Sequence, residues 1–125
     1  MNKQLLIVDD EVEICEFLRT FFEERDYLVA IAHSGDEAIQ TVEKIQPDVV
    51  LLDVQMPGEL DGLETLKWIK HKYPQIKVIM VTALETHDKI EKALRYGADN
   101  YITKPLSLEY LEKDVQDKIE HLAKR

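Results

Sequence analysis

Short apolar, β-branched runs alternate along the chain with segments whose apolar residues recur at helical spacing, and this alternation constrains the fold more than any other feature. Three of the five runs are almost continuously apolar, which is typical of strands buried on both faces of a parallel sheet. The alternation predicts an α/β fold of five strand–helix units, (βα)5, doubly wound around one parallel sheet. The predicted strands cover residues 5–8, 28–32, 48–52, 77–81 and 100–102.

Helix start and stop signals between these runs agree with that order. Ser34 and Glu37 fit a capping box at the start of the second helix, and Gly97 fits the position just past the end of the fourth. Pro47 and Pro74 follow the second and third helices. The apolar faces predicted for the first four helices are Ile14, Leu18, Phe21 and Phe22; Ala38, Ile39, Val42 and Ile45; Leu63, Leu66 and Ile69; and Ile90, Ala93 and Leu94.

The last segment, residues 107–125, keeps its apolar residues on one side and contains no glycine or proline. Its predicted apolar face is Leu108, Leu111, Val115, Ile119 and Leu122, and its predicted ion pairs are Glu109–Lys113, Asp114–Lys118 and Glu120–Lys124. We interpret it as an amphipathic helix that packs on the sheet. The alternative interpretation is that this helix continues into a linker or output domain, or joins a partner helix.

Composition excludes several classes of protein. The chain has 125 residues, which suits one compact domain, and 25 acidic against 16 basic residues give a net charge of −9. This acidic balance argues against direct nucleic-acid binding, and no apolar run approaches the ~20 residues of a membrane span. A single cysteine, Cys15, excludes an internal disulfide and fits a reducing compartment. Because the first residues show no signal-peptide pattern, we expect a cytoplasmic protein.

Polar side chains follow the predicted strands, at the sheet edge where open parallel sheets bind ligands. These residues are Asp9, Asp10 and Glu11 after the first strand, Asp53 at the end of the third, Thr82 after the fourth and Lys104 after the fifth. Carboxylates this close repel one another, and a bound cation or a raised pKa relieves the repulsion. Since the ligands are oxygens and the histidines are scattered along the sequence, Mg²⁺ is favoured over Zn²⁺.

A divalent cation beside a lysine and a hydroxyl suits the recognition of a phosphoryl group. Asp53 can then attack phosphorus and form an acyl phosphate, as carboxylate nucleophiles do. Each residue alone has a simpler explanation, because a strand-end aspartate often caps a helix, a threonine often lies in a turn and a lysine is often solvated. Their arrival together at one edge favours a common site.

Four motifs, in this order, resemble those of response-regulator receiver domains, the phosphoacceptor domains of two-component signal transduction that include chemotaxis regulators. The motifs are Ile7-Val8-Asp9-Asp10-Glu11, Leu51-Leu52-Asp53-Val54-Gln55-Met56-Pro57-Gly58, Val81-Thr82-Ala83 and Gly97-Ala98-Asp99-Asn100-Tyr101-Ile102-Thr103-Lys104-Pro105. The likeness covers essentially the whole chain, so it implies a single receiver domain over residues 1–125. It also implies the flavodoxin-like strand order 2-1-3-4-5, of which a chemotaxis receiver is a known example.

The resemblance implies a role for each residue at the sheet edge. Asp53 is expected to accept a phosphoryl group from a sensor histidine kinase or a phosphotransfer protein. Asp10, Asp53 and the backbone carbonyl of Gln55 are expected to bind Mg²⁺, or Mn²⁺ in its place. Asp9 belongs to the same metal site and orients metal-bound water, and Lys104 pairs with the phosphate.

The resemblance also implies a switch. Thr82 is expected to swing towards the phosphoryl group, and Tyr101 to move inward with it. The peptide between Lys104 and Pro105 is expected to be cis, which an X-Pro bond permits at modest free energy. On this interpretation the protein is not an enzyme in the ordinary sense. It is a phosphoacceptor that promotes its own Mg-dependent phosphorylation and the hydrolysis of its acyl phosphate.

The output surface implied by the resemblance combines the fourth helix, the fifth strand and the fifth helix. Its predicted residues are Leu94, Tyr96, Tyr101, Tyr110 and Leu111. This surface is expected to control an output domain or a partner protein, and it also allows a homodimer.

The sequence departs from the receiver pattern at two places, and other functions stay open. One extra residue lengthens the segment between Gly58 and Asp61, and Leu106 replaces a common phenylalanine. A phosphatase of the haloacid dehalogenase type needs a second aspartate where Gln55 stands. A flavodoxin-type binder needs a phosphate loop where the acids after the first strand stand. A degenerate receiver that serves only as an interaction module is the third alternative.

Overall fold

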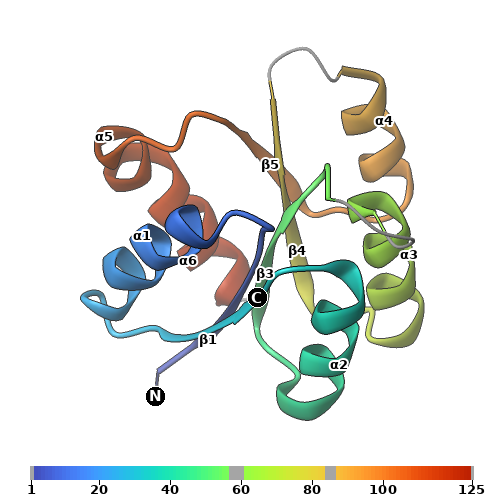
Figure 1. Cartoon of the computed structure of the whole chain (residues 1–125), viewed down its shortest axis with the longest axis horizontal. Coiled ribbons are helices and arrows are strands. Elements are labelled where there is room, and N and C mark those ends of the chain that lie inside the picture. The colour runs from blue at the N-terminus through green and yellow to red at the C-terminus, as the bar shows by residue number, and fades with distance from the viewer. Residues whose placement is uncertain (1, 57–60, 84–86, 125) are drawn as a thin grey trace.

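The computed structural model describes residues 2–56, 61–83 and 87–124, and within them it contains one five-stranded parallel sheet (Figure 1). The strand order is β2-β1-β3-β4-β5, as predicted. Each strand lies within one residue of its predicted limits, because the apolar runs end where polar residues reach the sheet edge. The strands are β1 (Gln4–Val8), β2 (Leu28–Ala32), β3 (Val49–Asp53), β4 (Lys77–Thr82) and β5 (Asn100–Thr103).

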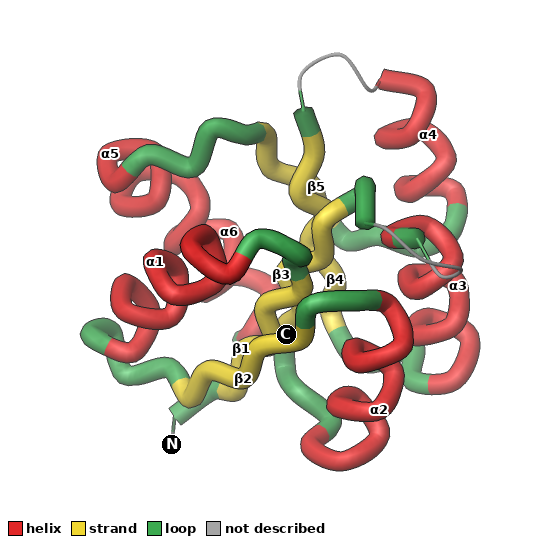
Figure 2. The backbone as a smooth tube through the Cα atoms, in the orientation of Figure 1, coloured by secondary structure: helices red, strands yellow, loops and turns green. Residues whose placement is uncertain are grey.

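Helices cover both faces of this sheet (Figures 1 and 2). Helix α1 and the C-terminal helical segments pack on one face, and α2, α3 and α4 pack on the other. None of the helices in the described ranges combines the length and the hydropathy that a membrane crossing requires. The helices are α1 (Val12–Glu23), α2 (Gly35–Ile45), α3 (Gly62–Lys72), α4 (His87–Arg95), α5 (Leu108–Tyr110), the π-helical η1 (Leu111–Val115) and α6 (Gln116–Ala123).

The three central strands explain the continuous apolar runs, since alternate residues of each strand enter different cores. Leu5 and Ile7 of β1 pack with α1 and α6, whereas Leu6 and Val8 pack with α2 and α3. All four side chains are at most 1% exposed. Burying an aliphatic side chain of this size stabilises a fold by about 1.5–3 kcal/mol, so two such cores hold the sheet firmly.

The C-terminal segment is helical from Leu108 onward, and Ser107 caps it by accepting a hydrogen bond from the Tyr110 N–H. Four of its five predicted apolar residues are buried, but Leu108 is 52% exposed, so the prediction is wrong there. The π-helical turn η1 was not predicted. A π turn adds a residue to one turn, which ordinary helical spacing in a sequence does not reveal.

The ion pairs of this segment differ in part from those predicted. Lys113 contacts Glu109 at 2.8 Å, as predicted. Lys118 instead donates a hydrogen bond to the backbone carbonyl of Tyr101 at 3.1 Å, and Glu120 accepts one from Gln116. Lys118 therefore links α6 to the edge strand β5.

Two glycines fulfil requirements of the backbone. Gly97 has φ +102° just past the end of α4, and the N–H of Ala98 reaches back to the carbonyl of Ala93, which confirms the predicted helix end. At Gly62, a Cβ atom would meet the carbonyl oxygen of Asp53 and lie 2.6 Å from that of Val54. The absence of a side chain at Gly62 therefore lets α3 begin directly against the end of β3.

Candidate functional site

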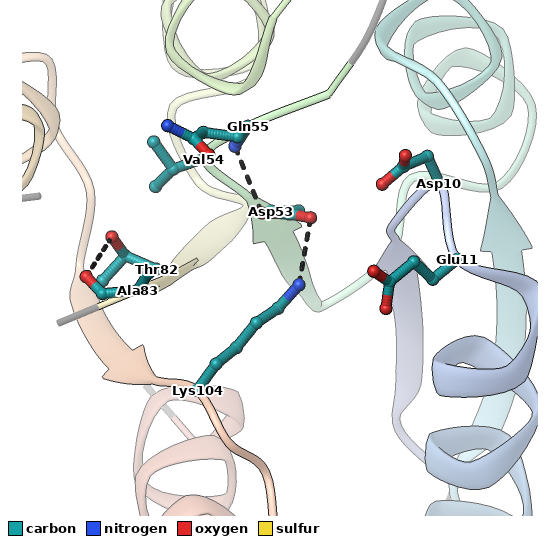
Figure 3. Close-up of a pocket in the computed structure, with 8 residues that line it drawn as sticks. All are labelled: Asp10, Glu11, Asp53, Val54, Gln55, Thr82, Ala83 and Lys104. Carbon is teal, nitrogen blue, oxygen red and sulfur yellow. Dashed lines mark hydrogen bonds and ion pairs between the residues drawn. The ribbon is translucent and has the colours of Figure 1, made fainter. Parts of the chain in front are cut away.

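Five of the predicted site residues meet at the carboxyl ends of the strands, namely Asp10, Asp53, Gln55, Thr82 and Lys104. They line a pocket of about 230 Å³ that opens beside the end of β3 (Figure 3). The remaining predicted metal residue, Asp9, is buried behind it and contacts Lys104. The residues that line the pocket are Asp10, Glu11, Asp53, Val54, Gln55, Thr82, Ala83 and Lys104.

Asp53 is the last residue of β3, and its side chain is the central acid of the site. One carboxylate oxygen accepts the Gln55 N–H at 3.1 Å, and the other lies 3.3 Å from Nζ of Lys104 (Figure 3). Burial raises the pKa of Asp53, and the neighbouring Asp9 raises it further, while the bonds from Gln55 and Lys104 act in the opposite direction. The net result is a carboxyl group whose charge is destabilised in this pocket.

Asp9, Asp10 and Asp53 form an acidic cluster, in which one oxygen from each residue lies within 4.8 Å of the others. Asp10 is exposed, whereas Asp9 and Asp53 are buried. Three carboxylates at this spacing fit a hard divalent cation, and Mg²⁺ is held in proteins by such oxygens together with waters. The donor set therefore fits the predicted metal.

Lys104 provides the positive charge of the site. Its Nζ atom lies 3.3 Å from Oδ2 of Asp9 and 3.3 Å from Oδ2 of Asp53. Burial opposes its charge, but the two carboxylates outweigh burial, so the pKa of Lys104 is raised and the side chain is an ammonium at neutral pH. Its backbone N–H donates to the Thr82 carbonyl at 2.8 Å, and the peptide that joins it to Pro105 is cis.

The two predicted switch residues lie in different surroundings. Thr82 is 2% exposed and lines the pocket, and its hydroxyl donates a hydrogen bond to the Ala83 carbonyl at 3.2 Å (Figure 3). Tyr101 is 38% exposed and lies on the outer strand β5, paired with Met80 of β4. The structure therefore brings Thr82 to the site and places Tyr101 on the surface beside it.

Two side chains support the backbone of Asp9, and neither contact was predicted from the sequence. The backbone carbonyl of Asp9 accepts hydrogen bonds from Nδ1 of His33, at 3.0 Å, and from the Cys15 thiol, at 3.4 Å. Burial and the nearby Asp9 raise the pKa of the Cys15 thiol to about 11. Only the position of His33, directly after the strand that pairs with β1, hinted at this contact in the sequence.

The residues of the predicted output surface differ in their exposure to solvent. Leu94, Tyr96 and Tyr101 are each more than one-third exposed, and Tyr110 is partly buried. The prediction is wrong at Leu111, since that side chain is completely buried in the core beneath η1. The lengthened segment after Met56, including Glu59 and Leu60, lies outside the described residues.

A family model, described as the response regulator receiver domain, matches residues 5–116. The chain belongs to this family. Receiver domains are the phosphorylation-dependent switches of two-component response regulators, and they interact with histidine kinases or phosphotransfer proteins and generally bind Mg²⁺.

Individual relatives carry the same domain. Over 117 residues the chain is 40% identical to a protein-glutamate methylesterase/protein-glutamine glutaminase of Trichodesmium erythraeum, an alignment that covers 90% of this chain and 33% of that protein. It is 41% identical over 108 residues to the alkaline phosphatase synthesis transcriptional regulatory protein PhoP of Bacillus subtilis. This alignment covers 86% of this chain and 44% of that protein. The chain thus spans less than half the length of these two relatives.

Solved structures agree with the fold. A CheY-like response regulator receiver domain protein from Methanospirillum hungatei matches with a TM-score of 0.88 and 30% identity, over 99% of this chain and 98% of that one. The receiver domain of NtrX from Brucella abortus matches with a TM-score of 0.83 and 29% identity, over 93% and 98%.

Proposed function

We propose that Asp53 is the phosphoacceptor of this domain and takes its phosphoryl group from a sensor histidine kinase or a phosphotransfer protein. The observation that carries this proposal is the setting of the Asp53 carboxylate. It is buried at the end of β3, opens to a pocket, contacts Lys104 and belongs to the acidic cluster. Neither a capping role nor a solvated surface role accounts for an aspartate with all these neighbours.

In the proposed step, a carboxylate oxygen of Asp53 attacks phosphorus and forms a new P–O bond. The bond from phosphorus to the leaving group breaks, and its electron pair stays with the imidazole nitrogen of a phosphohistidine or the carboxylate oxygen of acetyl phosphate. The Lys104 ammonium, already within 3.3 Å of Asp53, pairs with the phosphoryl oxygens.

Mg²⁺ fits the proposed site through Asp10, Asp53 and the backbone carbonyl of Gln55, with Asp9 as the fourth member; Mn²⁺ suits the same oxygens. When bound, the ion neutralises charge on the phosphoryl oxygens. The acyl phosphate carries roughly −1.5 to −2 charge in place of the single charge of the Asp53 carboxylate, beside the carboxylates of Asp9 and Asp10. Lys104 alone cannot balance this charge, so we expect phosphorylation to require the metal.

The proposed switch begins at Thr82. Its hydroxyl leaves the Ala83 carbonyl and donates to a phosphoryl oxygen, and Tyr101 moves inward as β5 repacks. A shift from 1:99 to 99:1 needs about 5.5 kcal/mol, and one charge-assisted hydrogen bond supplies about 1.5–3 kcal/mol. Lys104 and the repacking of Tyr101 supply the rest in this proposal.

The proposed output surface comprises α4, β5 and α5, where Leu94, Tyr96 and Tyr101 are exposed. It would contact an output domain, a partner protein or a second copy of the domain. We further propose that residues 1–125 form the receiver domain of a cytoplasmic protein and that the helix from residue 107 leads towards an output domain. The net charge of −9 favours output through protein contacts of this domain rather than through nucleic acid.

Intact-mass spectrometry after incubation with acetyl phosphate tests the proposal. We expect one phosphoryl group per chain, only with Mg²⁺, and none in Asp53→Asn. The control Asp117→Asn, which removes a carboxylate on α6 away from the pocket, is expected to behave as wild type. Repeated turnover without a stable adduct would indicate an enzyme, and no addition to a folded domain would indicate a degenerate receiver.

A further inference from the structure

The outer edge of β5 is covered by side chains of the chain itself. β5 pairs with β4 on one side only, so the backbone groups of Tyr101 and Thr103 point away from the sheet. The Tyr101 N–H donates to Oδ1 of Asn100 at 2.8 Å, and the Thr103 N–H donates to the Tyr110 hydroxyl at 3.2 Å. The Tyr101 carbonyl accepts from Nζ of Lys118 at 3.1 Å. The edge is thereby tied to the C-terminal helical segments.

Lys118 contacts both the backbone and the ring of Tyr101. Besides its bond to the carbonyl, its Nζ atom lies 5.9 Å from the centre of the Tyr101 ring, within range of a cation–π interaction. Lys118 lies on α6 next to Ile119, whose side chain is fully buried, so the core fixes the backbone position from which the Lys118 side chain extends. The ammonium therefore favours the outward orientation in which Tyr101 is 38% exposed.

Thr82 is in the arrangement that accompanies the outward orientation of Tyr101. Its hydroxyl bonds to the Ala83 carbonyl, while Tyr101 stays beside Lys118. An inward movement of the ring would take it away from the ammonium, so the inward state loses a contact that the outward state keeps. A contact made in only one of two states shifts their populations towards that state.

We propose that Lys118 is a positioning residue that holds Tyr101 outward and so opposes the rearrangement that phosphorylation favours. This inference rests on the proposed function, in which Thr82 and Tyr101 move together. Loss of the contact is expected to raise the ratio of inward to outward Tyr101 about threefold to tenfold. In this proposal the inward state is the one that accepts the phosphoryl group faster, so a domain already shifted inward is phosphorylated at a higher rate.

Fluorine NMR of protein labelled with meta-fluorotyrosine tests this, with the Tyr101 signal assigned through Tyr101→Phe. The solvent-isotope shift of that signal reports the exposure of the ring without any phosphoryl donor. We expect the Tyr101 ring to be less exposed in Lys118→Gln than in the wild-type protein. In Lys118→Arg we expect its exposure to equal the wild-type value. The matched control is Lys113→Gln, which removes a lysine of the same helical run that pairs with Glu109, and it is expected to leave Tyr101 unchanged.

Unchanged exposure of Tyr101 in Lys118→Gln, or an equal change in Lys113→Gln, would overturn the proposal. The second readout is the initial rate of phosphorylation by acetyl phosphate with Mg²⁺, expected to rise about threefold to tenfold in Lys118→Gln alone, in proportion to the population of the inward state. If the Tyr101 ring moves inward in Lys118→Gln but the phosphorylation rate is unchanged, the proposed coupling between the ring orientation and phosphorylation is overturned. A wild-type domain that takes no phosphoryl group would instead contradict the proposed function, and the exposure measurement would still decide whether Lys118 holds the ring.

Discussion

Nζ of Lys104 lies 3.3 Å from Oδ2 of Asp53, and this contact joins the last strand of the sheet to the middle one across the intervening strand β4. The same ammonium lies 3.3 Å from Asp9, so one cation faces two buried carboxylates. The two carboxylates partly balance the positive charge of Lys104. Its ammonium lies where it can pair with a phosphoryl group on Asp53. The phosphorylation rate and the stability of the domain are therefore expected to depend on both Lys104 and Asp53, and substitutions at these positions measure that dependence.

Replacing Lys104 by methionine keeps the side-chain stem and removes the charge. We expect phosphorylation by acetyl phosphate to slow by about tenfold to a hundredfold, the effect of losing one charge-assisted hydrogen bond of about 1.5–3 kcal/mol. Initial rates from intact-mass spectra measure this. Lys104→Arg keeps the charge and is expected to retain more of the rate, whereas equal loss in both variants would count against an electrostatic role.

The raised pKa of Asp53 predicts a specific pH dependence of stability. Because the folded state binds this proton more tightly than the unfolded state, the contribution of Asp53 is fully present below its unfolded pKa of about 3.9 and is lost as the pH rises through its folded value. Asp53→Asn, which cannot ionise, is therefore expected to be more stable than wild type at neutral pH.

Urea unfolding of both proteins between about pH 4.5 and pH 7.5 checks this sign. The stability advantage of Asp53→Asn is expected to grow towards the higher pH, where wild-type Asp53 is ionised. A variant that is less stable than wild type at neutral pH, by a margin that grows with pH, would show that Lys104 outweighs burial and Asp9.

Magnesium is expected to stabilise the folded domain through the acidic cluster. A ligand present at about 100 times its dissociation constant adds about 2.7 kcal/mol to the free energy of unfolding. Asp10→Asn removes an exposed carboxylate of the cluster without disturbing the core, so it is expected to abolish most of this gain. Thermal unfolding with Mg²⁺ and with a chelator measures the effect, and Asp117→Asn is the control. A gain of the same size in Asp10→Asn would place the metal elsewhere.

Gly62→Ala is expected to damage both the fold and the site. The new Cβ would meet the carbonyl oxygens of Asp53 and Val54, so α3 must move away from the end of β3, at about 1–3 kcal/mol of stability. Urea unfolding and the phosphorylation rate are both expected to change. Gly97→Ala, strained by its φ of +102° but remote from the pocket, is the control that should lose stability and keep its rate.

The sequence predicted the architecture well where burial on both sides left a clear pattern. The runs of β1, β3 and β4 identified the central strands, and the carboxyl-end rule then placed Asp53, Thr82 and Lys104 at one sheet edge, where all three line the pocket. The strand order itself came from the family resemblance, since apolar runs do not specify which strands are neighbours.

The remaining differences have local physical causes. Leu94 and Leu108 follow helical spacing, but neither belongs to one of the two cores, and they are 48% and 52% exposed. Leu111 was predicted both on the apolar face of the last helix and on the output surface, and its burial in the core confirms the first prediction and contradicts the second. The bond from His33 to the Asp9 carbonyl depends on side-chain orientation across two strands, which no pattern along the chain reports.

The central claim is that Asp53 itself receives the phosphoryl group. Borohydride reduces an acyl phosphate to an alcohol and releases phosphate, so it converts a phosphorylated aspartate to homoserine, which peptide mass spectrometry can place. After treatment with acetyl phosphate and Mg²⁺, we predict homoserine at position 53 and unmodified Asp9 and Asp10. Homoserine at another carboxylate, with Asp53 intact in a folded and phosphorylated domain, would contradict the account.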